Sequence, residues 1–409
     1  MRPLAVLLAA LMALTGPALA EEEAFKVAVV LPYHGSYDPH WVYKAHQLPE
    51  KLQELLSATY SEGYDIKVYP GEFETFGVTK VTLKESQGKT YEIHQESIRT
   101  EEETLETEFG YALKQAAQFT NKGKDGLIVI LPGFLNRGGQ HQGVEIPELI
   151  ERVLVEDQKV PRYAFVYQQF GIASWDRQDD LGVIPELMYK NIEKEKEKQL
   201  VNINTNDSNL QSLLQGIQNP TLKDLIDKVK NELGLLVIAF GTLRSSYWPD
   251  YKANIEYVLR YLRDKLGIDE SKAKFFAFNN PEIGPKNWDK SRWTLRYDNF
   301  KQLMQDLNNA GVKYVLVVPY LTVTGITDRK LFEGNPKQGE PDAYKCGNAI
   351  LQHFKATLVA ETEADKEQYT YVQDGKEKDV TIYINTRIYK ISKSELGTND
   401  DMYIIYVRR

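Results

Sequence analysis

Cysteine is almost absent from this sequence, which has 409 residues and a single cysteine, Cys346. One thiol cannot form a disulfide bond within the chain, so we expect the hydrophobic core to stabilise the fold, even in an oxidising compartment. After the first 20 residues, no stretch approaches the roughly 18 apolar residues that a membrane-spanning helix needs. The sequence also lacks a glycine-rich nucleotide loop and a cysteine cluster, which predicts that no nucleotide serves as cofactor.

Positive charge is also in short supply. The chain carries 50 Lys and Arg residues against 58 Asp and Glu residues, a formal net charge of −8. Nucleic acids and anionic membrane surfaces attract proteins through an excess of basic residues. We therefore expect no nucleic acid among the partners, while small ligands stay open.

The first 20 residues, MRPLAVLLAALMALTGPALA, have the pattern of a cleavable signal peptide. One positive charge precedes an apolar run over 4–14, and a Gly-Pro break leads to the small residues of Ala18-Leu19-Ala20. The run is too short to cross a bilayer. We predict cleavage after Ala20, a periplasmic or secreted protein, and no membrane insertion once the signal peptide is removed.

The remaining 390 or so residues alternate between strand and helix patterns, and their number suggests two domains. Apolar, β-branched runs predict strands, and apolar residues at helical spacing predict helices. This alternation is typical of parallel sheets covered by helices on both faces, so the predicted fold class is α/β. The predicted strands lie within 25–32, 64–70, 126–132, 162–169, 233–242, 273–285 and 312–325, and the predicted helices within 41–56, 101–119, 145–154, 247–267 and 297–310.

Composition sets the expected domain boundaries. Residues 189–232 are dense in charge and then rich in Asn and Ser, with no core-forming pattern before Leu225, which predicts a solvated connector. It separates an N-terminal domain, 21–188, from a C-terminal domain, 233–409. Residues 78–100 are polar and predict an inserted hairpin. The C-terminal segments 369–375, 379–391 and 401–409 alternate with period two, which predicts an antiparallel extension.

The order of elements recurs across the connector. The stretch VAVVLPYHGSYDPHWVYKAH and the later stretch LLVIAFGTLRSSYWPDYKAN share a strand, a turn and a Tyr-Lys-Ala on the following helix. LIVILPGFLNRGG and YVLVVPYLTVTG share a strand, a Pro, an apolar pair and a Gly. We therefore predict an internal duplication, with 25–170 and 233–335 forming two parallel units of the same strand order.

Two loop motifs carry a family resemblance. A strand leads into His-Gly-Ser-x-Asp-Pro at 34–39, and a later strand leads to Gly-Gly-x-His before an Ile-Pro helix start. In these features the chain resembles the class II tetrapyrrole chelatases, the long-form sirohydrochlorin cobaltochelatases and ferrochelatases with two tandem halves. The resemblance implies two chelatase-like parallel-sheet units with flanking helices and a macrocycle between them. It also implies that His34 and His141 serve as metal ligands and proton acceptors.

The implied reaction fits these residue types. Inserting Co2+ or Fe2+ into a sirohydrochlorin-like tetrapyrrole without ATP requires removal of two pyrrole protons and release of the ion from a temporary site. A neutral imidazole can accept a proton and bind a borderline metal ion. The carboxylates of Glu72 and Glu74, at the end of the second strand, would balance charge and accept a proton. The aromatic ring of Trp41 is a candidate to stack on the macrocycle.

Each of these residues also has a purely structural interpretation. His34 can be a turn residue, Glu72 and Glu74 solvated loop acids, and Trp41 a packing residue. Asp38 is expected to cap the helix that follows the loop. Among the other histidines, surface positions are expected for His40, His46, His94 and His353.

The two halves differ in their imidazoles. Thr242 stands in the second half where the first half has His34, so the metal ligands are expected from the first half. The interval from Pro132 to His141 is one residue longer than in the family, which places Gln140 at the family's position. An alternative function follows, a non-catalytic periplasmic protein, derived from a chelatase, that binds a metal or a tetrapyrrole.

Overall fold

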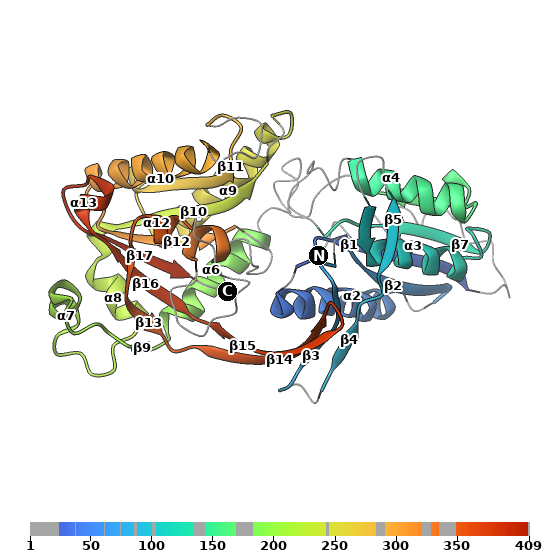
Figure 1. Ribbon diagram of the computed structural model, residues 1–409, viewed down its shortest axis with the longest axis horizontal. Helices are drawn as coiled ribbons and strands as arrows, with labels where there is room; N and C mark the ends of the chain where they lie inside the picture. The colour runs from blue at the N-terminus through green and yellow to red at the C-terminus, as the bar shows by residue number, and fades with distance from the viewer. Residues whose placement is uncertain are drawn as a thin grey trace.

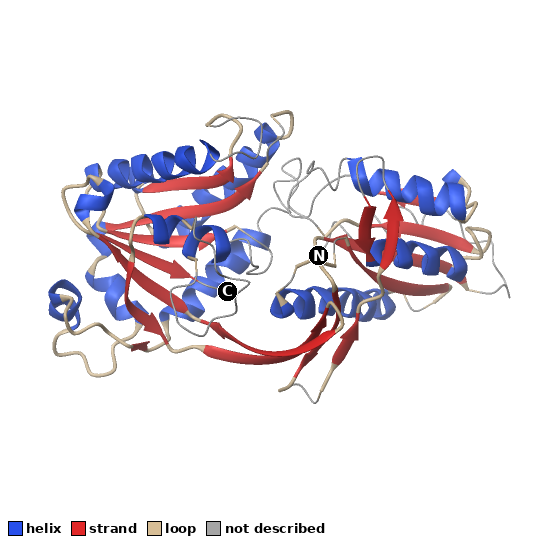
Figure 2. Ribbon diagram, viewed as in Figure 1, coloured by secondary structure: helices blue, strands red, loops and turns tan. Residues whose placement is uncertain are grey.

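The computed structural model shows a mixed α/β protein with parallel and antiparallel sheets, as the strand and helix patterns predict. Two units, each a sheet flanked by helices, are bridged by a long bent ribbon of strands (Figures 1 and 2). The structure describes residues 24–36, 38–60, 62–73, 75–85, 88–99, 104–133, 144–168, 183–242, 245–283, 291–320, 329–334 and 349–407.

The first unit is built on a parallel sheet with the strand order β2-β1-β7-β8. Its central strand, β1, buries both faces because its β-branched residues point alternately to α2 and to α3. Val27 and Val29 pack in one core cluster with Leu56 of α2, and Ala28 and Val30 pack in another with residues of α3. The elements are β1 (Phe25–Tyr33), α2 (Pro39–Thr59), β2 (Tyr64–Glu72), α3 (Glu108–Phe119), β7 (Gly126–Ile130), α4 (Ile146–Ile150) and β8 (Phe165–Tyr167).

The second unit has a parallel array of the same strand order, β11-β10-β12-β17. The predicted recurrence of strand order is therefore present, but the fourth strand comes from the end of the chain and lies outside 233–335. Helices α9 and α10 cover opposite faces. The elements are β10 (Leu233–Gly241), α9 (Trp248–Leu266), β11 (Ala273–Asn279), α10 (Ser291–Asn309), β12 (Tyr314–Pro319), α12 (Ile350–His353), α13 (Lys393–Leu396) and β17 (Met402–Val407).

The C-terminal strands correct one expectation. We expected 401–409 to add an antiparallel strand, and β17 is indeed antiparallel to β16 (Thr386–Ile391), but it is parallel to β12. Its side chains Tyr403–Val407 are buried throughout because helices and loops cover both faces. Beyond β16, β13 (Thr357–Thr362) and β9 (Leu200–Val201) extend this sheet with antiparallel pairing.

The segment expected to be a solvated connector belongs to the core of the second unit. It contains most of α6 (Val183–Lys196), together with α7 (Ser208–Leu214) and α8 (Leu222–Lys228). The few apolar residues of its helices are spaced so that they lie on the helix face that packs against the core. The many charged residues between them therefore face solvent. The buried members are Ile192, Leu200, Leu210, Leu214, Leu222, Leu225, Ile226 and Val229.

A ribbon of two strands joins the units. β14 (Asp365–Gln373) and β15 (Lys376–Ile384) form a hairpin that continues from β13 and β16, and its outer part pairs with β3 (Val78–Leu83) of the first unit (Figure 1). The inserted hairpin predicted within 78–100 is thus present as β3 and β4. The other two strands of its sheet, β14 and β15, come from the C-terminal part of the chain. The remaining strands are β4 (Thr90–Glu92), β5 (Glu96–Arg99) and β6 (Thr104–Thr107).

Candidate metal centre

His34 lies in the loop after β1, and its side chain is exposed. Its Nδ1 lies 2.7 Å from the carbonyl oxygen of Gly35, and its ring is stacked on Phe76 with the centroids 6.1 Å apart. The indole Nε1 of Trp41 donates a hydrogen bond to the carbonyl oxygen of His34. Because Trp41 is only 9% exposed and packs in a core cluster, its ring holds this loop and presents little surface to a macrocycle.

Two of the predicted site residues, Glu74 and His141, lie outside the described residues. The pairing of His34 with His141 therefore stays a prediction. The signal peptide over 1–20 also lies outside the described part of the chain.

The loop that carries His34 is fixed at its other end by the predicted helix cap. The side chain of Asp38 accepts a hydrogen bond from the backbone N–H of His40 at 3.0 Å, which confirms the cap of α2. The backbone N–H of Ser36 donates to Oε1 of Glu72 at 3.2 Å. This second bond ties the loop to the end of the neighbouring strand.

Glu72 is not a solvated loop acid. It is the last residue of β2, its side chain is fully buried, and it lies beside two further buried titratable residues, His46 and Glu108. One ligating atom from each of the three lies within 4.8 Å of the others. We call these three residues the His46 centre.

Hydrogen bonds hold the His46 centre together. Nε2 of His46 lies 3.1 Å from Oε2 of Glu108, and the same oxygen accepts a bond from the backbone N–H of Glu72 at 3.1 Å. Nδ1 of His46 lies 2.8 Å from the carbonyl oxygen of Val42 and donates its hydrogen there, because a carbonyl can only accept. This bond orients the imidazole with Nε2 toward the carboxylates, as in histidines that ligate metals.

The elements explain why these three side chains meet. Glu72 ends β2 at the carboxyl edge of the parallel sheet, where loops and helix starts converge. Glu108 is the first residue of α3, directly after the cap Thr107. His46 was expected on the surface but is only 3% exposed. A signal was available, because His46 follows buried Val42 by four residues and so lies on the apolar face of α2.

Burial and mutual charge shift the pKa values of the centre. Burial, together with the charge of Glu108, raises the pKa of the Glu72 carboxyl to about 8, against the opposing effect of His46. Burial alone would lower the pKa of His46, but the two carboxylates raise it to about 9. At neutral pH the metal-free centre therefore holds an imidazolium at His46 and a protonated Glu72.

Two oxygens at this place are buried and have no hydrogen-bond partner among the described residues. They are Oε2 of Glu72 and the hydroxyl of Tyr33, the last residue of β1. Most buried polar atoms in proteins are hydrogen-bonded, so two orphaned oxygens on register partners of adjacent strands point to a missing ligand.

Among the described residues of the second unit, no such group of donors lies at the corresponding place. The shared Tyr-Lys-Ala sequence aligns His46 with Asn254. Glu72 pairs in register with the last residue of β1. Asn279 pairs in register with the last residue of β10, so it occupies the position that corresponds to Glu72. Nη2 of buried Arg296 donates to Oδ1 of Asn279 at 2.8 Å. A fixed guanidinium thus lies beside the counterpart of Glu72, and it disfavours a cation there.

The second unit buries a different group of charges. The guanidinium of Arg387, on β16, is fully buried, and its Nη1 lies 2.9 Å from Oε1 of Glu333. Its Nε lies 3.8 Å from Oε2 of Glu361 on β13. The hydroxyl of Tyr389 donates to the same oxygen of Glu333. The positive charge of Arg387 compensates carboxylates that water cannot reach.

His40 was expected on the surface and is buried instead, because the ribbon covers it. Its Nδ1 lies 2.7 Å from Oε2 of Glu367 and 3.0 Å from the hydroxyl of Tyr369, both on β14. Nζ of Lys44 donates to Oε1 of Glu367 at 3.0 Å. The other two expectations are confirmed, since His94 and His353 are exposed.

Acid should weaken the contact between α2 and the ribbon. Burial would raise the pKa of Glu367, but hydrogen bonds from His40 and Tyr369 lower it to about 2. A carboxyl whose pKa is depressed in the folded state contributes stability above its unfolded pKa and loses it as pH falls. We expect Glu367→Gln to remove on the order of 2 kcal/mol at neutral pH, with the difference from wild type vanishing between about pH 4.5 and 2.

Urea unfolding across this pH range measures the effect. The matched control is Glu363→Gln, at an exposed position between β13 and the ribbon. A difference between wild type and Glu367→Gln that does not change with pH would contradict the prediction.

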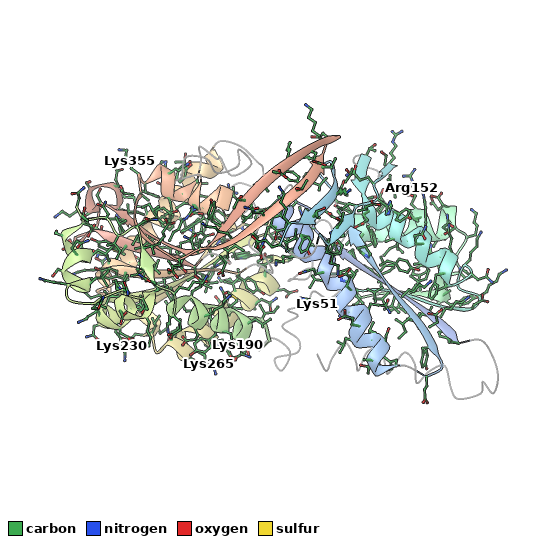
Figure 3. All side chains as sticks on the ribbon, turned by 90° about the horizontal axis from the view of Figure 1, so that it is seen from below. Lys51, Arg152, Lys190, Lys230, Lys265 and Lys355 are labelled. Atoms are coloured by element: carbon green, nitrogen blue, oxygen red, sulfur yellow. The ribbon has the colours of Figure 1, made fainter. Side chains whose placement is uncertain are left out.

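Basic side chains are spread over both units. Figure 3 labels six of them, which come from both units. Nucleic-acid-binding proteins cluster such residues on one face. The expectation of no nucleic-acid partner stays a prediction. The six are Lys51, Arg152, Lys190, Lys230, Lys265 and Lys355.

Among the described helices, none combines the length and the apolar character needed to cross a bilayer. Compared with known proteins, the chain matches no protein-family model, and no curated protein is significantly similar to it.

Proposed function

We propose that the protein binds a metal ion at the His46 centre, between His46, Glu72 and Glu108. The observation that carries this proposal is the burial of one imidazole and two carboxyls whose ligating atoms lie within 4.8 Å of one another. An ion that replaces the protons of His46 and Glu72 would compensate both carboxylates. One nitrogen and two oxygen donors suit Fe2+ and Co2+, the two ions that the resemblance to the chelatases implies.

Removal of any one ligand should abolish tight binding. We expect His46→Ala, Glu72→Gln and Glu108→Gln each to weaken Co2+ binding by more than the roughly 10–100-fold that loss of an outer-shell partner costs. Glu72→Gln is the sharpest of the three, because it replaces a carboxyl that is protonated in the metal-free protein by an amide of the same shape. Its thermal midpoint without metal should stay close to that of wild type.

Equilibrium dialysis with Co2+ and with Fe2+ under anaerobic conditions measures the binding. The control variants are His94→Ala and Glu92→Gln, which change the same residue types at exposed positions. Equal Co2+ binding by wild type and by Glu72→Gln would contradict the proposal that the His46 centre binds the metal ion.

We further propose that the bound ion is the substrate of a chelatase reaction, with a sirohydrochlorin-like tetrapyrrole as its acceptor. Two features support this proposal. Exposed His34 lies at the end of a parallel strand, where a macrocycle can reach its imidazole, and the Ser36–Glu72 hydrogen bond connects its loop to the His46 centre. His34 would accept pyrrole protons together with His141. The non-catalytic binding protein remains the alternative, favoured by the complete burial of the centre.

His34→Ala should abolish insertion of the metal while leaving the fold and Co2+ binding intact, because an exposed loop side chain contributes little to the core. Purified protein is incubated with sirohydrochlorin and Co2+, and the absorbance change is followed against a metal-only sample. His353→Ala, a change of another exposed histidine, is the control. If the wild type binds the metal but does not insert it, the non-catalytic alternative is favoured. If His34→Ala turns over at the wild-type rate, His34 has only a structural role in its turn.

A further inference from the structure

The phenol of Tyr33 lies at the His46 centre, yet no described residue binds its hydroxyl. Tyr33 and Glu72 are register partners on adjacent parallel strands, so their side chains point to the same face of the sheet. The ring of Tyr33 meets that of His46 edge to face, with the centroids 5.6 Å apart. Tyr33 is 1% exposed, so its hydroxyl is closed to bulk solvent.

Tyr33 is an unfavourable choice for a purely structural position. A buried hydroxyl without a hydrogen bond costs about 1–3 kcal/mol, a cost that phenylalanine of nearly the same shape would avoid. Oε2 of Glu72 is orphaned in the same region. A metal ion bound by both oxygens would satisfy them together and would explain why both are present.

We propose that the His46 centre also takes Fe3+, with the phenolic oxygen of Tyr33 as its fourth ligand. This inference rests on the proposed metal centre and names a further ion that the centre binds. On binding, the oxygen of Tyr33 forms a bond to the ion, and the phenolic proton is released to solvent. The donors are then one imidazole nitrogen, two carboxylates and one phenolate.

Charge balance favours this ion. With a neutral Tyr33, the two carboxylates balance a divalent ion, whereas a phenolate adds a third negative charge that balances a trivalent one. A buried site with a net charge is costly, so the phenolate and Fe3+ stabilise each other. Three anionic oxygens are also hard donors, which suit a small trivalent ion, and tyrosine is a ligand of iron in haem proteins.

The experiment uses the visible charge-transfer absorption of phenolate bound to Fe3+. The full mature chain is titrated with Fe3+ supplied as its nitrilotriacetate complex, and with Co2+ in parallel. We expect a coloured 1:1 complex in wild type, and loss of the band with at least about 100-fold weaker Fe3+ binding in Tyr33→Phe. Co2+ binding should survive in Tyr33→Phe, because this variant loses only a hydroxyl without partners.

Tyr91→Phe is the matched control. Its ring also lies close to His46, with the centroids 5.7 Å apart, but its hydroxyl donates to Glu50 at 2.7 Å. The band should persist in this variant. Co2+ binding without an Fe3+ band, or a band unchanged in Tyr33→Phe, would overturn the inference and leave the proposed function standing. If neither ion binds wild type, the proposed function falls with it.

Discussion

Tyr369→Ala should lower the free energy of unfolding by about 3–5 kcal/mol, the usual cost of truncating a large buried aromatic side chain. Tyr369 is fully buried and belongs to the apolar cluster that the ribbon forms with α2 and β3. Its ring lies 5.6 Å from that of Tyr43, and its hydroxyl donates to Glu367. The substitution therefore removes packing and a polar contact at the junction of the two units.

Thermal and urea unfolding measure the loss, and limited proteolysis reports whether the ribbon leaves the first unit. Tyr383→Ala is the control, because Tyr383 lies on the same ribbon but is 40% exposed. Tyr369→Phe should fall between the two. If Tyr369→Ala and Tyr383→Ala behave alike, the ribbon does not stabilise the first unit.

Arg387→Met should cost a similar amount, about 3–5 kcal/mol, because removal of one partner leaves buried carboxylates without a counter-charge. The ion pairs of Arg387 with Glu333 and Glu361 are closed to solvent. Methionine keeps much of the volume, so the loss reports charge and not a cavity.

A double-mutant cycle isolates this electrostatic part. Adding Glu333→Gln to Arg387→Met should recover part of the lost stability, since the amide carries no uncompensated charge. Lys390→Met, three residues further along β16, is the control, because its half-buried ammonium pairs with Asp207 and Asp401 near solvent. A double variant less stable than Arg387→Met would contradict the prediction.

The parallel sheets were predictable because their strands are local, apolar and regularly spaced. The runs over 25–32 and 233–242 correspond to β1 and β10, each a strand that pairs on both sides. The placement of β17 was not predictable in the same way. Its sequence alternates like that of an antiparallel strand, and its parallel partner β12 lies far away along the chain. Strand patterns carry little information on distant partners.

The His46 centre was predictable only in part. Glu72 was a candidate because it ends a strand at the carboxyl edge of a sheet. His46 was assigned to the surface because a single histidine on a helix has no distinctive pattern. Glu108 stood in a run of acids predicted to open a helix, and of these Glu106 lies in β6. Only the packing of α2 and α3 against opposite faces of one sheet brings these side chains together. His40 was misplaced for a related reason, since the ribbon that buries it comes from the other end of the chain.

The pairing of β3 with the ribbon has a consequence for how the chain folds during synthesis. His40 and Glu367 are 327 positions apart in the sequence. At about 5–20 residues per second, the ribbon is made roughly 15–65 s after α2. Throughout that interval β3 exposes an unpaired edge and the apolar residues Val78 and Val81, the kind of surface on which chains aggregate. We therefore expect the nascent first unit to need protection from aggregation until the ribbon has been made.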